Sequence, residues 1–220
     1  STHAGTETPL YMTLNGSSMS TAVAAGATTM ARQFLRVNEG IVEPRSDFIR
    51  SVLINGADDL GTPDIPNAFE GWGQINISNS LFPEFSGVDL ELLYDDSREW
   101  KSGHSFVYTI QSNGDSRFDV TLVWNDPEGS AVANQSSPKL MNDLDLKITS
   151  PSGLVYYGNN FANGNSVTST IADSLNNVER FRIDSTEIGV WSVEVGHAGG
   201  NLQDYAIVMS GEISETILPD

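Results

Sequence analysis

The stretch LNGSSMSTAVAAGATTMARQFLR, residues 14–36, carries the clearest secondary-structure pattern in the chain. Its apolar residues recur at steps of three and four, at positions 19, 23, 27, 30 and 34, which predicts a helix over about 18–36. Gly16 allows a tight entry into this helix. The first half is apolar or small nearly all round, which is typical of a helix buried in the middle of a larger structure. We therefore expect covering elements that this sequence does not contain.

Serines crowd the start of this helix, and a serine hydroxyl has two ordinary uses there. It can cap free backbone N–H groups, for which serine is a preferred residue. It can also act as a nucleophile, because the helix end supplies positive potential and backbone donors that stabilise an oxyanion. Residue type and spacing alone favour capping over catalysis.

The texture of the sequence changes near residue 82. Before it, the apolar spacing is helical, with a second helix predicted from about Pro44 to Gly56 and a short helical end within 71–81. After it, apolar and polar residues alternate, and Gly, Pro, Asn and Ser turns punctuate the alternation. The turn cluster FPEFSG, residues 82–87, is the best boundary, so we expect domains at 1–82 and 83–220.

Eight short segments after this boundary read as strands, each with one apolar face. Such a pattern predicts a two-sheet antiparallel sandwich of the jelly-roll type. Trp124 and Trp191 fall in alternating segments and are therefore expected in the core. The predicted strands are 88–94, 104–111, 117–125, 142–149, 154–158, 178–184, 189–196 and 204–210.

The segment NGSSMSTAVAAG closely resembles the nucleophile segment of subtilisin-like serine proteases, usually written G-T-S-M-[AS]-x-P-x-V-A-G. Ser17 stands where Thr is usual, and Ala22 stands where Pro is usual, a change that removes no reactive group. The residues in register are Gly16, Ser18, Met19, Ser20, Ala25 and Gly26.

The resemblance covers nearly the whole chain. PRSDFIRSVLINGADDLG and GWGQINISNSL look like the last helices of that catalytic domain. LVWNDPEGS and LMNDLDLKITSPSGLVYYGNNF are similar to the C-terminal jelly-roll domain of larger bacterial subtilisin-like proteases. The implied fold is an α/β fragment, the C-terminal part of a parallel-sheet catalytic domain, followed by an all-β jelly-roll sandwich.

By this resemblance Ser18 is the catalytic nucleophile, and its backbone N–H is one oxyanion donor. Asn15, Gly16 and Ser17 would line the cleft beside the scissile bond of a protein or peptide substrate. The hydrolysis would pass through an acyl-enzyme on the serine, which needs a base to take its proton. The resemblance also implies a secreted, extracellular enzyme.

The triad of such proteases runs in chain order Asp, His, Ser. Only 17 residues precede Ser18, and they contain no aspartate and one histidine, His3, which lacks the H-G-T-H type of context. We therefore expect an N-terminal half of the same protease to supply the Asp, the His and the oxyanion Asn. The chain begins with serine rather than methionine, which suggests a processed protein or a fragment. Alone, it is expected to be inactive.

Composition narrows the partners. The formal net charge is −18, from 11 basic and 29 acidic residues, so nucleic acid is not expected as a partner. There is no cysteine, which excludes disulfides and thiolate chemistry. No apolar run approaches the roughly 20 residues that a membrane span requires.

The motif NDLDL, residues 142–146, predicts a calcium site. In a strand, Asp143 and Asp145 point to one face, and two adjacent like charges repel unless a cation lies between them. Asn142 would complete the oxygen shell, with Asp126 from a neighbouring turn as a further ligand. The alternative is a pair of solvated carboxylates on an outer face.

A second function class stays open. The chain could be a catalytically inert binding or stabilising β-sandwich module that retains a remnant protease segment. Reaction of Ser18 with a serine-directed probe separates this hypothesis from the enzyme.

Overall fold

The structure, a computed structural model, describes residues 4–8, 11–13, 15–96, 99–129 and 139–215. Most of its regular elements are strands. The described residues form three helices, α1 (Ser17–Val37), α2 (Ser46–Asn55) and α3 (Ile77–Leu81). All three agree with the helices predicted from the sequence, and Gly56 ends α2 as expected. None of these helices is long and apolar enough to cross a membrane.

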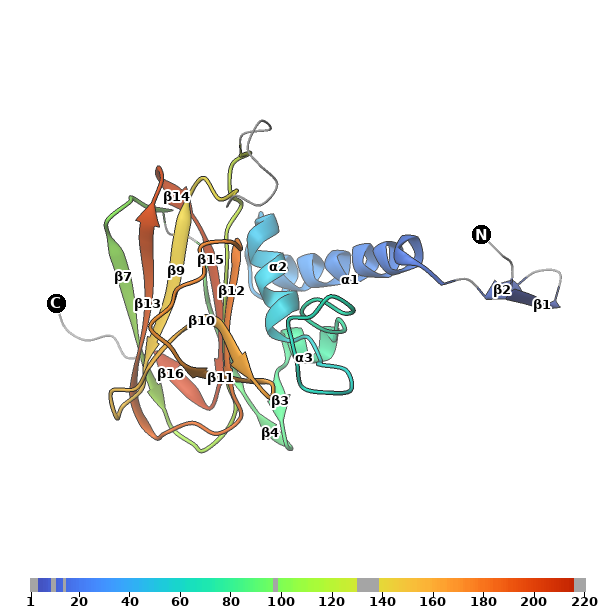
Figure 1. Cartoon of the computed structure of the whole chain (residues 1–220). Coiled ribbons are helices and arrows are strands. Elements are labelled where there is room, and N and C mark those ends of the chain that lie inside the picture. Colours follow the sequence, from blue (N-terminus) through green and yellow to red (C-terminus); the bar gives the residue numbers. More distant parts are fainter. Residues whose placement is uncertain (1–3, 9–10, 14, 97–98, 130–138, 216–220) are drawn as a thin grey trace.

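Two antiparallel sheets face each other as a sandwich (Figure 1). Each of the eight predicted strand segments overlaps a strand of this sandwich. The six-stranded sheet has the order β11 (Asn165–Thr168), β10 (Val155–Ala162), β9 (Asp143–Thr149), β13 (Gly189–Gly199), β7 (Ser105–Ser112) and β16 (Ile213–Glu215). The four-stranded sheet has the order β12 (Val178–Ile183), β8 (Phe118–Val123), β15 (Ala206–Gly211) and β5 (Glu91–Asp95).

Three small strand pairs accompany the sandwich, and all pairs among the described residues are antiparallel. A hairpin lies beyond the N-terminal end of α1, on the side away from the sandwich (Figure 1). The pairs are β1 (Ala4–Thr8) with β2 (Tyr11–Thr13), β3 (Glu84–Phe85) with β4 (Val88–Asp89), and β6 (Glu99–Trp100) with β14 (Gln203–Asp204).

The main hydrophobic core fills the space between the two sheets. It follows the predicted alternation, since Phe118, Val120 and Leu122 of β8 are fully buried there. Trp124 and Trp191 are also buried in this core, as expected. Aromatic rings pack edge to face in it, with the rings of Phe118 and Trp191 5.7 Å apart. Every second side chain of these strands therefore points into the space between the sheets, as the alternation predicts.

Both faces of the four-stranded sheet are buried, although β8 has the one apolar face that its alternation predicts. Every residue of β8 and β15 is buried, because α2 packs on the outer face of this sheet. Polar residues of that face bond to the helix rather than to water. The amide of Asn55 donates to the hydroxyl of Ser210 (2.8 Å) and accepts from that of Thr121 (3.0 Å).

Helix α1 divides into a packed half and an exposed half. Ala27, Ala31 and Leu35 are buried against α2 and its surroundings. The N-terminal half projects away from the sandwich (Figure 1), and the side chain of Val23 is 71% exposed. The apolar surface predicted for this half is therefore uncovered among the described residues.

One hydrophobic cluster joins both sides of the proposed domain boundary. Leu35, Phe48 and Val52 of the helices pack with Ala206 and Val208 of β15. The division into 1–82 and 83–220 stays a prediction.

Candidate functional site

The first turn of α1 holds the residues predicted to react. Gly16 is the N-cap, with φ 146° and ψ 165°, a backbone conformation that residues with a side chain rarely adopt. Its carbonyl oxygen accepts the backbone N–H groups of Met19 (3.1 Å) and Ser20 (3.2 Å). Because the cap is a glycine, no serine caps this helix, and the capping interpretation is wrong.

Ser18 lies exposed in this first turn. Within the described part of the chain, its hydroxyl has no hydrogen-bond partner. The two described histidines, His104 and His197, belong to the sandwich, where the backbone N–H of His197 donates to the carbonyl of His104 (3.0 Å). His3 lies outside the described residues. The described residues thus contain no base bonded to the serine.

A groove of about 680 Å³ runs beside this helix start. Asn15 and Gly16 line it, as do Met19 and Val23 of α1. The opposite wall belongs to the segment between α2 and α3, with Leu60, Phe69 and Glu70 among its residues. The structure therefore brings two of the predicted cleft residues into one groove, while Ser17 and Ser18 lie outside its lining.

The two aspartates of NDLDL share one face of β9, as predicted. Leu144 and Leu146 are buried on the opposite face, while Asp143 and Asp145 are partly exposed. Asp145 has no hydrogen-bond partner among the described residues. One carboxylate oxygen of Asp143 is buried and unpartnered.

The other two predicted ligands already serve neighbouring groups. The carboxylate of Asp126 accepts the backbone N–H groups of Met141 and Asn142, each at 2.8 Å. The buried amide of Asn142 donates to Gln203 (2.6 Å) and accepts the backbone N–H of Asn201 (2.6 Å). Asp126 nevertheless lies close enough to Asp143 for its charge to raise the pKa of that carboxyl, so the four-residue ligand set stays a prediction.

Two further acidic residues, Asp173 and Glu179, lie close enough to the aspartates of β9 for their charges to interact. Burial raises the pKa of Asp145 to about 6, and the charges of Asp143 and Asp173 raise it further. Burial also raises the pKa of Glu179 well above its usual range, and Asp145 adds to the effect. One oxygen of Glu179 accepts the backbone N–H of Leu146 (2.7 Å), and the other is buried without a partner.

The sequence does not single out Glu179, because its segment alternates between apolar and polar residues as an ordinary strand does. One feature of the sequence indicates its burial. In a strand, Glu179 lies on the same face as Phe181, which packs in the core. Asp173 lies in a turn, where its carboxylate accepts the amides of Asn159 (2.6 Å) and Asn176 (2.7 Å).

Part of the chain matches the model of a known protein family. Residues 1–73 match the model of Peptidase S8, the subtilase family. This range contains the hairpin, α1 with Ser18, α2 and most of the segment leading to α3.

Three curated proteins of Dictyostelium discoideum are similar to the chain. Serine protease/ABC transporter B family protein tagA is 26% identical over 98% of the chain and 13% of its own length. The tagD protein of the same description is 28% identical over 75% of the chain and 12% of its length. The tagB protein is 25% identical over 91% of the chain and 13% of its length. The chain thus spans about an eighth of the length of these relatives.

Among solved structures, the P-domain of Macrobrachium rosenbergii nodavirus covers 54% of this chain and 90% of its own, with 13% identity and a TM-score of 0.16. A likeness this weak carries no argument about the fold or the function.

Proposed function

We propose that the chain is the C-terminal portion of the catalytic domain of a subtilisin-like serine endopeptidase, followed by a jelly-roll sandwich domain. The observation that carries this proposal is Ser18 in the exposed first turn of α1, inside the segment that matches the subtilase family. The substrates would be proteins or peptides, and the protein would act outside the cell.

The start of α1 suits the nucleophile role for a physical reason. The carbonyl of Gly16 occupies the N–H groups of Met19 and Ser20. Among the described residues, the N–H groups of Ser17 and Ser18 have no acceptor, so they remain available to a substrate. A free N–H at a helix start stabilises the negative charge that develops on a carbonyl oxygen under attack. Gly16 also leaves the approach open, since a Cβ there would meet only Met19, at 3.9 Å.

In the proposed reaction the hydroxyl of Ser18 attacks the scissile carbonyl and forms an acyl-enzyme. A histidine from another segment accepts the hydroxyl proton and returns it to the leaving amine. An aspartate of that segment orients the histidine, and an asparagine supplies a second oxyanion donor. We propose that this segment is the N-terminal half of the same protease.

The exposed half of α1 supports this partner. Val23 is 71% exposed and Met19 40% exposed, and Gly26 has open space where a side chain would stand. An apolar helix face of this kind is normally buried. Covering it would place the partner segment directly beside Ser18.

Labelling by a fluorophosphonate tests the proposal on the complete protein that contains this chain. We expect the probe to react with Ser18, because only an activated serine attacks it. Ser18→Ala should abolish labelling, whereas Ser20→Ala, which changes another exposed serine of the same turn, should retain it. If the complete protein is never labelled, or if Ser18→Ala leaves the label in place, the chain is instead an inert binding or stabilising module.

We also propose a calcium ion near β9, held by Asp143, Asp145 and Glu179. Unpartnered, buried oxygens on Asp143 and Glu179 fit a cation there, since such oxygens are costly without a partner. Carboxylate oxygens are the ligands that Ca²⁺ prefers. The ion would neutralise the like charges that these residues bring together, with Asp173 beside them. Asp126 and Asn142, proposed from the sequence, would be further ligands, since Asn142 adjoins Asp143 and the charge of Asp126 reaches it.

A further inference from the structure

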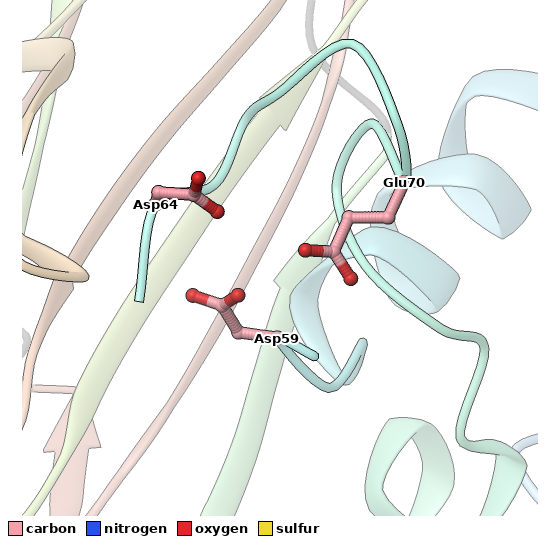
Figure 2. Close-up of side chains that lie close together, drawn as sticks. All are labelled: Asp59, Asp64 and Glu70. Carbon is pink, nitrogen blue, oxygen red and sulfur yellow. The ribbon is translucent and has the colours of Figure 1, made fainter. Parts of the chain in front are cut away.

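A second acidic cluster lies outside both sites, in the segment between α2 and α3. Asp59, Asp64 and Glu70 each place one carboxylate oxygen within 4.8 Å of the others. Figure 2 shows the three side chains converging from different parts of this segment. Two isolated antiparallel bridges, Asp58 with Gln74 and Asn67 with Gly71, bring the two ends of this segment together.

Two of the three carboxylates have donors within the segment. The amide of Asn67 donates to Asp64 (2.8 Å) and to Glu70 (2.9 Å). The second oxygen of Glu70 accepts the backbone N–H of Leu60 (3.0 Å). These bonds hold Asp64 and Glu70 close together in spite of their like charges.

Asp59 is different, and its carboxylate points into the space between the other two (Figure 2). Both of its oxygens are buried, and neither has a hydrogen-bond partner. A buried carboxylate without donors is strongly disfavoured, and two neighbouring carboxylates disfavour it further.

A neighbouring cationic side chain does not supply the missing hydrogen bonds. Arg182 lies close enough for its charge to interact with that of Asp59. Its guanidinium group, however, donates to Asp119 (2.7 Å) and to the carbonyl of Ala57 (3.4 Å). The orphaned oxygens of Asp59 therefore point to a ligand other than this arginine.

We propose that Asp59, Asp64 and Glu70 bind a divalent cation of the calcium type. The donor set is oxygen only, as hard cations require, and it contains neither the histidine nor the cysteine that zinc sites use. The cation would take the place of the missing donors to Asp59. This inference does not depend on the protease activity or on the site near β9.

The site has a structural consequence for the groove beside Ser18. Leu60, Phe69 and Glu70 form part of the wall opposite Asn15 and Gly16. A cation that joins residues 59, 64 and 70 would fix this wall. Binding should therefore slow amide hydrogen exchange in the segment 58–74.

Calorimetric titration with CaCl₂ alone tests the proposal. The complete 220-residue chain, stripped with a chelator, is studied as Asp145→Asn, which disables the site proposed near β9. We expect one equivalent of Ca²⁺ to bind to this variant. Adding Asp59→Asn or Asp64→Asn should weaken that binding at least tenfold, and the slowed exchange in 58–74 should disappear.

Asp64 is exposed, so Asp64→Asn keeps the test valid if Asp59→Asn does not fold. Asp89→Asn, an exposed acid outside the cluster, is the matched control and should bind as the parent does. The proposal is overturned if Asp145→Asn binds no Ca²⁺, or if Asp64→Asn binds with unchanged affinity and stoichiometry.

Discussion

The guanidinium group of Arg180 donates to the backbone carbonyl of Asn55 across 2.9 Å, although the two residues are 125 positions apart. Arg180 belongs to β12 of the sandwich, and Asn55 is the last residue of α2. The bond satisfies a carbonyl at a helix C-terminus, where a positive charge is favoured. Arg180 also donates to Asp119 (3.0 Å), so a buried ionic network joins the helix to the sheet.

Asp119→Asn should destabilise the chain strongly. Its carboxylate accepts bonds from Arg180 and Arg182, and removing the charge leaves two buried guanidinium groups uncompensated. We expect a loss of about 3–5 kcal/mol in the free energy of unfolding. Chemical denaturation measures it. Asp184→Asn, which removes an exposed partner of Arg117, should cost less than about 1 kcal/mol; similar losses for both variants would contradict the assignment.

Asp119 should also make the free energy of unfolding fall at low pH. Burial by itself would raise the pKa of Asp119, but the charges of Arg182, Arg180 and Arg117 outweigh it and hold that pKa below its usual value. Its stabilising contribution is therefore complete above about pH 4 and is lost as the pH falls further. Urea denaturation at a series of pH values should show a steeper acid loss in the parent than in Asp119→Asn. If the free energy of unfolding falls equally with pH in the parent and in Asp119→Asn, groups other than Asp119 cause the loss of stability in acid.

Val23→Glu should separate the chain from the complete protein. In the chain, Val23 is 71% exposed, so the charge should change the free energy of unfolding by no more than about 0.5 kcal/mol. In the complete protease the same charge would be buried against the partner segment, at a cost of about 2 kcal/mol or more. Thermal denaturation of both forms measures the difference. Gln33→Glu, exposed on the same helix, is the control for the added charge, and equal effects of Val23→Glu in both forms would refute a covering partner.

Calcium stabilisation through Asp145 should grow with pH. The raised pKa of about 6 means that the folded state holds this proton more tightly than the unfolded state does. Without a cation, the contribution of Asp145 is greatest at low pH and is lost as the pH rises through about 6. Calcium needs the deprotonated form, so chelation should lower the melting temperature more at about pH 7 than at about pH 5. Asp145→Asn should remove this difference, whereas Asp89→Asn should keep it; a chelation effect equal at both pH values would contradict the proposed ligand.

The periodic patterns predicted the elements well. The apolar positions of α1 repeat at three and four residues, and the observed helix, Ser17–Val37, extends the predicted one by a single residue at each end. Likewise Leu144, Leu146 and the two aspartates of β9 take the faces that their alternation requires. Helix bounds and strand faces depend on residues that are close in the sequence, so the local pattern of apolar residues is enough to predict them.

The candidate site was only partly predictable. The serine segment identified Ser18 through a resemblance, but not that Gly16 would be the cap or that the exposed helix start would face the segment of Leu60 and Phe69. Asn142, which adjoins Asp143, and Asp126, from a neighbouring turn, are predicted as calcium ligands, and this stays a prediction. What the sequence did not predict is that both side chains also form hydrogen bonds, Asp126 with backbone N–H groups and Asn142 with Gln203.

The sequence by itself determined the helices, the strands, the two tryptophans of the core and the serine at the helix start, because each depends on spacing within a few residues. Only the tertiary structure decided that α2 covers one sheet, that Arg180 reaches Asn55, and that Glu179 lies near Asp145. It also brought Asp59, Asp64 and Glu70 together. These contacts join distant residues, and the burial that sets their charges and partners exists only once the chain has packed.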